Sequence, residues 1–83
     1  MLPNLQFNAK WKEELVCSTD HGEFSLDLTM GKLTVYFPDE AGFNSSAPKW
    51  AIGHWQEIHD ALKAWCESAS IPLVIEPGGD VYR

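Results

Sequence analysis

Long apolar runs and basic clusters are both missing from this chain of 83 residues. No segment reaches the roughly 20 consecutive apolar residues that a membrane-spanning helix needs. The N-terminal sequence also lacks a basic stretch followed by the apolar run of a signal peptide. From these two absences we expect a cytoplasmic protein that has no membrane partner.

Basic residues are scarce overall. Lysine and arginine number six against twelve aspartates and glutamates, which gives a formal net charge of −6. A field of this sign repels a phosphate backbone, so direct binding to nucleic acid is not expected. The acidity favours solubility, and it would also complement a basic protein. A hydrophobic fraction of 45% indicates a folded chain, and this length predicts one domain, residues 1–83.

Cysteine is also rare, with only Cys17 and Cys66. Two residues are too few for a disulfide framework, and both fall at expected inward positions, where cysteine acts as a small hydrophobe. They could join the histidines in a metal site only if four such ligands converged. His54 and His59 are separated by about 140° around a helix, so one helix cannot present both to a single ion. We therefore expect no metal and no cofactor.

Residues 23–37 have the clearest pattern in the chain. Apolar and polar residues alternate on both sides of Gly31-Lys32, a pair that suits a type II′ hairpin turn because glycine adopts a positive φ without steric cost. The predicted cross-strand pairs are Met30–Leu33, Leu28–Val35, Leu26–Phe37, Thr29–Thr34 and Asp27–Tyr36. The first three pairs share an apolar face, and the other two share a polar face.

The other expected elements are an arm over the core (1–10), a first strand (11–19), a loop (38–47), a helix (47–68), an edge strand (71–77) and a mobile tail (78–83), in which Val81 and Tyr82 could nevertheless dock. A two-residue loop at His21-Gly22 would place Cys17 opposite Leu26, on the core face. Ser45 or Ser46 can cap the helix, because a serine hydroxyl accepts a backbone N–H there. The prolines that flank the last strand are tolerated at a sheet edge.

The helix has an apolar stripe that matches the apolar face of the hairpin. The stripe comprises Ala51, Trp55, Ile58, Leu62, Trp65, Cys66 and Ala69. A sheet and a helix with one apolar face each bury those faces against one another. The predicted fold class is therefore α+β: a three-stranded antiparallel meander, one amphipathic helix packed on one face, and a short C-terminal edge strand, in the order β-β-β-α-β.

A second apolar set lies on the flank of the expected helix. It consists of Trp50, Ala61 and Ala64, beside His54 and Glu57, and we call these five residues the Trp50 flank. Tryptophan with a polar rim is typical of interface centres. The alternative is that the loop or the N-terminal arm packs over Trp50 and buries it. Phe43 in the loop and Tyr36 on the open sheet face add further candidate contacts, and Phe43 would be a core residue if it tucked under the loop.

Catalytic arrangements are weakly represented. His54 and Glu57 are three residues apart on the helix, and Asp27 lies near Tyr36, but such pairs are common surface contacts. The sequence has no nucleophile motif and no phosphate-binding loop. We therefore expect a protein that is not an enzyme.

Three functional hypotheses follow. The first is a non-catalytic interaction protein, an accessory, adaptor or inhibitor, that binds a protein partner or itself through the Trp50 flank or a strand edge. The second is an acidic neutraliser of a basic protein, such as an immunity protein or a phage-encoded inhibitor. The third is a small enzyme or ligand carrier that uses His54 and Glu57, or Asp27.

Overall fold

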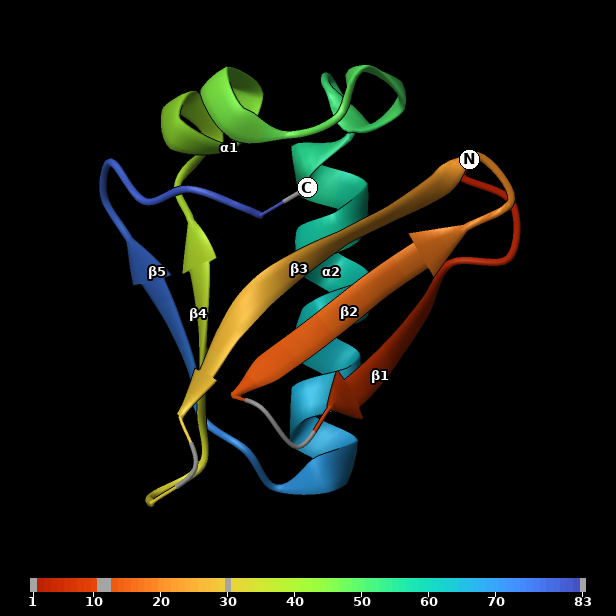
Figure 1. The fold of residues 1–83 in the computed structure, drawn as a ribbon. Coiled ribbons are helices and arrows are strands. Elements are labelled where there is room, and N and C mark those ends of the chain that lie inside the picture. The colour runs from red at the N-terminus through yellow and green to blue at the C-terminus, as the bar shows by residue number, and fades with distance from the viewer. Residues whose placement is uncertain (1, 11–12, 30, 83) are drawn as a thin grey trace.

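One mixed sheet of five strands forms the centre of the protein, in a computed structural model that describes residues 2–10, 13–29 and 31–82. The elements in chain order are β1 (Gln6–Lys10), β2 (Glu14–Thr19), β3 (Gly22–Thr29), β4 (Thr34–Pro38), α1 (Glu40–Ser46), the 3₁₀ turn η1 (Lys49–Ala51), α2 (Trp55–Ala69) and β5 (Leu73–Glu76). Helix α2 lies behind the sheet, and α1 lies at one end (Figure 1). The opposite face of the sheet has no helix over it.

The strands lie in sequence order across the sheet, β1-β2-β3-β4-β5. The first four form an antiparallel meander, and β5 runs parallel to β4. A parallel neighbour requires a crossover, which here contains α1, η1 and α2. The predicted α+β class and the C-terminal edge strand are confirmed. The meander has four strands rather than three.

The hairpin of β3 and β4 has the predicted register. Leu28 pairs with Val35, Thr29 with Thr34, and Asp27 with Tyr36. Met30 lies outside the described residues, so its predicted pair and the geometry of the turn are not described. The expected pair of Leu26 with Phe37 is absent from the ladder among the residues described, because β3 and β4 separate beyond Asp27.

The predicted register of the first two meander strands is wrong by two residues. Thr19 pairs with Gly22, so the two-residue loop is Asp20-His21, and Cys17 lies opposite Phe24 rather than Leu26. Gly22 has a φ of 145°, a conformation that only glycine adopts easily. Since side chains alternate with period two, a shift of two leaves every residue on its predicted face. Cys17 is indeed buried.

The N-terminal segment is a strand rather than an arm. In β1, Phe7 pairs with Cys17 and Ala9 with Leu15, so Phe7 and Ala9 share the inner face. The ring of Phe7 lies 6.2 Å from that of Trp65 on α2. The apolar residues of β1 are too few to show a period of two in the sequence, whereas the pairing with β2 supplies the backbone hydrogen bonds.

The predicted helix at 47–68 is divided into smaller elements. The expected loop contains α1, which is capped by Asp39: its carboxylate accepts the Gly42 N–H at 2.9 Å. The chain turns again at Gly53, whose φ of 88° is incompatible with a continuous helix. Helix α2 therefore begins at Trp55. From there the predicted stripe is correct at its centre, since Ile58, Leu62 and Cys66 are buried.

The C-terminal tail is docked rather than free. Where β4 leaves β3, Tyr82 forms an isolated antiparallel bridge with Ser25, and its N–H donates to the Ser25 carbonyl at 2.9 Å. Val81 is buried, and its N–H donates to Ser46 Oγ at 2.9 Å. The tail crosses from β5 towards β3 in Figure 1. It thereby fills the gap that the separating strands leave.

The core lies between the sheet and α2. Its largest fully buried side chains are Phe24, Phe37, Phe43, Leu15, Leu26, Ile58, Leu62 and Val35. Leu33, which the alternation placed on the apolar face, is 44% exposed because it lies at the end of the β3–β4 hairpin, beyond the strand pairs.

Candidate functional site

The Trp50 flank does not form one helical surface. Trp50 belongs to η1, before the turn at Gly53, whereas His54, Glu57 and Ala61 accompany α2. The Trp50 ring lies 5.9 Å from Phe24 and 6.5 Å from His21. It is half-buried and packs on the core at the β2–β3 turn. The alternative that the chain itself covers Trp50 therefore fits its position.

His54 and Glu57 meet, but Glu57 also has a structural role. His54 Nδ1 lies 3.3 Å from Glu57 Oε1, while the Leu2 backbone N–H donates to Glu57 Oε2 at 2.5 Å. This backbone bond, together with the neighbouring His54, lowers the pKa of Glu57 below its ordinary value. The carboxylate thus holds the N-terminal segment, and buried Leu2, against α2.

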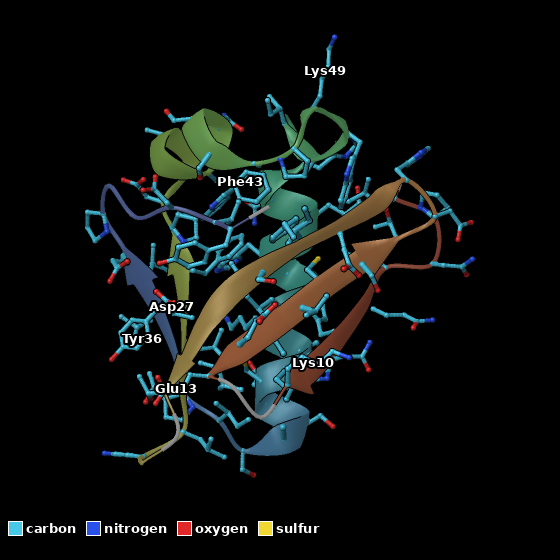
Figure 2. All side chains as sticks on the ribbon, in the orientation of Figure 1. Lys10, Glu13, Asp27, Tyr36, Phe43 and Lys49 are labelled. Atoms are coloured by element: carbon cyan, nitrogen blue, oxygen red, sulfur yellow. The ribbon has the colours of Figure 1, made fainter. Side chains whose placement is uncertain are left out.

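Phe43, another candidate contact, is fully buried. Its ring lies 5.7 Å from Phe24 and 5.6 Å from Phe37. Figure 2 shows it beneath α1, facing the sheet. Phe43 is therefore a core residue, and the prediction that it forms an exposed contact is wrong. The short helix α1 covers one end of the core through this side chain.

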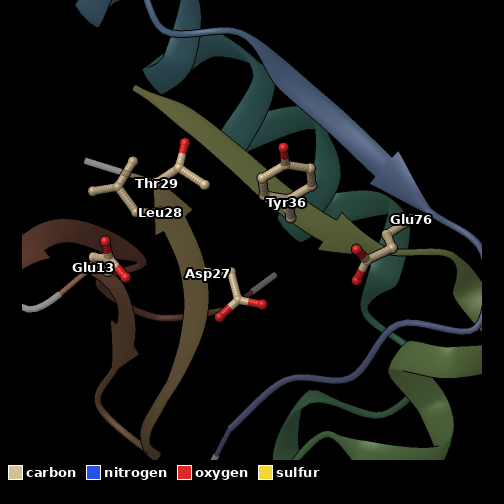
Figure 3. A pocket seen from close by; sticks show the side chains of 6 residues that line it. All are labelled: Glu13, Asp27, Leu28, Thr29, Tyr36 and Glu76. Carbon is tan, nitrogen blue, oxygen red and sulfur yellow. The ribbon is translucent and has the colours of Figure 1, made fainter. Parts of the chain in front are cut away.

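Tyr36 and Asp27 lie together on the open face of the sheet, around a pocket of about 200 Å³. The pocket is lined by Glu13, Asp27, Leu28, Thr29, Tyr36 and Glu76. Asp27 extends from β3 and Glu76 from β5, on either side of Tyr36 on β4 (Figure 3). Two carboxylates therefore flank one aromatic ring, and a third, Glu13, lines the pocket beyond Asp27.

Like charges meet beside this pocket among the described residues. Glu14 lies directly opposite Asp27 in the β2–β3 ladder, and like charges in that position destabilise a sheet. Within residues 2–10, 13–29 and 31–82, no lysine forms an ion pair with either carboxylate. Lys10 and Lys49 lie well away from the Asp27 and Tyr36 group (Figure 2).

A second tyrosine reports the negative field. Tyr82 Oη donates to Asp27 Oδ2 at 3.2 Å. The charge of Asp27, this hydrogen bond and the more distant charges of Asp80 and Glu76 all raise the pKa of Tyr82 above its ordinary value. The docked tail thus adds Asp80 to the acidic surface, which we call the acidic face: Glu13, Glu14, Asp27, Glu76 and Asp80, with Tyr36 and Tyr82.

No protein-family model, curated protein or solved structure is significantly similar to this chain.

Sequence reasoning found Asp27 and Tyr36 but missed Glu13, Glu76 and Tyr82. Glu13 lies in the turn just before β2 with a φ of 59°, and its carbonyl accepts the Leu28 N–H at 3.2 Å. This conformation could not be read from the alternation. Glu76 reaches the pocket only because β5 pairs with β4, and no pattern in the sequence indicates that pairing.

The metal-ligand types are scattered. Cys17 and Cys66 are buried, and burial raises the pKa of Cys17 to about 12 and raises that of Cys66. His59 stacks on Trp55 with ring centroids 4.9 Å apart. Among the described residues, no three histidine, cysteine or carboxylate side chains are arranged to hold a metal ion. In the same residues, no helix has the length and apolar character to cross a membrane.

Proposed function

We propose that this protein binds a basic protein partner, without catalysis, through the acidic face of its sheet. The observation that carries the proposal is the pocket lined by Glu13, Asp27 and Glu76, in which Asp27 and Glu76 flank Tyr36. It develops the acidic-neutraliser hypothesis and replaces the Trp50 flank with a surface that points to solvent.

The cross-strand pair of Glu14 and Asp27 supports this function. Two carboxylates placed opposite each other cost folding stability, so their presence is most easily explained by a partner that neutralises them. Natural proteins depart from local stability rules mainly at functional sites. A cation bound beside Asp27 would offset part of this repulsion in the bound state.

The pocket suits a lysine or arginine side chain. A guanidinium or ammonium group between Asp27 and Glu76 would form charge-assisted hydrogen bonds. Tyr36 lies between them, where its ring can contact the stem or the cation itself. A basic partner would also be drawn to the chain by its net charge of −6.

The test is capture of partners from the source cell with the immobilised protein, followed by titration of the purified partner by calorimetry. The double variant Asp27→Asn/Glu76→Gln removes two charges from the acidic face. We expect it to weaken binding by at least about tenfold, because each lost charge-assisted bond is worth about 1.5–3 kcal/mol. Binding by the wild type should also weaken steeply with added salt.

The matched control is Asp60→Asn/Glu67→Gln, which removes the same charge from exposed positions on α2. It should leave the affinity within about twofold, since these positions lie on the other layer. Equal losses for the two double variants would show that only net charge matters. A captured partner that is acidic, or whose affinity is insensitive to salt and to both variants, would overturn the proposal.

A further inference from the structure

Within the described part of the chain, one edge of β5 has no neighbouring strand. In the parallel ladder, the carbonyls of Pro72 and Glu76 accept hydrogen bonds from backbone N–H groups on the β4 side. The backbone N–H and C=O groups of the even-numbered residues in this strand therefore point towards β4. By the alternation of a parallel ladder, the N–H and C=O groups of Leu73 and Ile75 point away from the sheet. Because β5 is the last strand in the sheet order, these four groups define an open edge.

The side chains along this edge are apolar. Val74 is 41% exposed and Ile75 is 38% exposed. Sheet edges are usually protected by charged side chains, of which lysine is the commonest. The opposite edge strand, β1, has Gln6, Asn8 and Lys10. On β5, by contrast, three apolar residues precede Glu76, and only prolines beyond the strand limit its extension.

Both faces beside this edge favour an added strand. On the inner face, Ile75 pairs with Phe37, whose ring stacks on Trp55 at 5.8 Å. Apolar side chains of an added strand would continue that surface. On the outer face, Glu76 lines the acidic pocket. An added strand would therefore meet an apolar surface on one side and a negative one on the other.

We propose that an extended segment of the basic partner adds to β5 as a sixth strand, with apolar residues on the inner face and lysine or arginine on the outer face. This inference rests on the proposed function and specifies how the partner is held. The charge argues against a second copy as the occupant, because two chains of net charge −6 would bring their acidic faces together. Backbone pairing gives affinity, and the alternating side chains give selectivity.

The experiment uses a short blocked peptide in which valine and lysine alternate, titrated into the folded protein and followed by amide NMR and hydrogen exchange. We expect the amides of Leu73 and Ile75 to become protected, while those of Phe7 and Ala9 on β1, which point away from β2, stay unchanged. The same peptide with glutamate in place of lysine should not bind. If neither β5 amide gains protection, strand addition is wrong.

Variants at one position separate the backbone from the side chain. Ile75→Pro removes an N–H that makes no bond to β4, and it should weaken the peptide by about tenfold through the lost bond and the clash of its ring. Ile75→Ala keeps the N–H and should weaken it less. Thermal unfolding shows whether each variant is folded. If Ile75→Pro does not fold, the hydrogen-exchange experiment on the wild type still tests strand addition.

The two proposals fail in different ways. If Asp27→Asn/Glu76→Gln weakens the peptide while Ile75→Pro does not, the acidic face binds cations but β5 adds no strand. If only Ile75→Pro weakens it, the edge binds a strand and the charge-based function is wrong. A doubled mass in solution without peptide, restored to a monomer by Ile75→Pro, would identify a second copy as the occupant and overturn the choice of a basic partner.

Discussion

Trp50 illustrates how one aromatic residue can resemble an interface centre in the sequence and serve the core in the structure. Its indole packs on Phe24 and lies over the β2–β3 turn. A Cβ on Gly22 would lie 3.0 Å from Trp50 Nε1, so the indole would have to shift slightly, while the φ of 145° is what favours glycine at this turn. Trp50 therefore anchors η1 to the hairpin and helps to fix where that hairpin turns.

Replacement of this side chain tests that structural role. We expect Trp50→Ala to lower the free energy of unfolding by about 2 kcal/mol, less than a fully buried tryptophan because part of the ring is exposed. The measurement is urea denaturation followed by circular dichroism. Ile52→Ala is the control, because Ile52 is 46% exposed and should change stability by less than about 0.5 kcal/mol. Normal stability with lost partner binding would return Trp50 to the interface.

At the level of elements, the sequence predicted those features that depend on residues close together in the chain. The β3–β4 register followed from alternation, and the centre of α2 followed from its stripe. Helix α1 was missed because Pro38, Gly42 and the serines suggested a loop, although Asp39 followed by Glu40 is a helix-start signal. The pairing of β5 with β4 and the docking of Val81 depend on contacts between distant segments. No local pattern contains that information, and these contacts bring Glu76 and Tyr82 to the acidic face.

The attachment of the N-terminal segment to α2 should depend on pH. The pKa of Glu57 is lowered from 4.5, chiefly by the Leu2 N–H. The unfolded chain therefore binds the proton more readily, so this contribution to stability is present above pH 4.5 and is lost as pH falls through the folded pKa. We expect Glu57→Gln to be less stable than the wild type at neutral pH, with a difference that shrinks in acid.

Urea denaturation across this pH range measures the difference. Glu67→Gln is the control on the same helix, since Glu67 is exposed beyond the N-terminal contact. The difference in unfolding free energy between Glu67→Gln and the wild type should not shrink in acid as that of Glu57→Gln does. A Glu57→Gln difference that stays constant from neutral pH to well below 4.5 would mean that the Leu2 bond does not hold the segment.

Considered as a whole, the molecule is asymmetric in its layers. One face of the sheet is covered by α2, which commits the apolar side chains inward, while the other face remains open and collects carboxylates from β2, β3, β5 and the tail. Five of the twelve acidic residues thus belong to the acidic face, and the other seven lie elsewhere on the molecule. The hairpin at 23–37 contributes to both faces of the sheet. Its apolar side chains pack in the core, and Asp27 and Tyr36 on its polar side line the pocket.

The strength of this field can be measured through Tyr82, whose pKa is raised first by the charge of Asp27 and then by their hydrogen bond. In a Tyr36→Phe background, Tyr82 is the only tyrosine left to titrate, and its absorbance should change above pH 10. Asp27→Asn should lower this pKa towards 10, and added salt should lower it because counterions screen the carboxylates. Glu76→Gln should have a smaller effect, since it removes a more distant charge.

The same shift sets the alkaline limit of tail docking. Because the folded pKa is raised, the bond from neutral Tyr82 to Asp27 contributes fully below pH 10 and is lost as pH rises through the folded value. Exchange of the Ser25 and Tyr82 amides should therefore accelerate in that range beyond the ordinary dependence on hydroxide, and Tyr82→Phe should remove the excess. If Tyr82 titrates at its ordinary value and responds to neither Asp27→Asn nor salt, the face does not concentrate negative charge and a basic partner loses its main physical support.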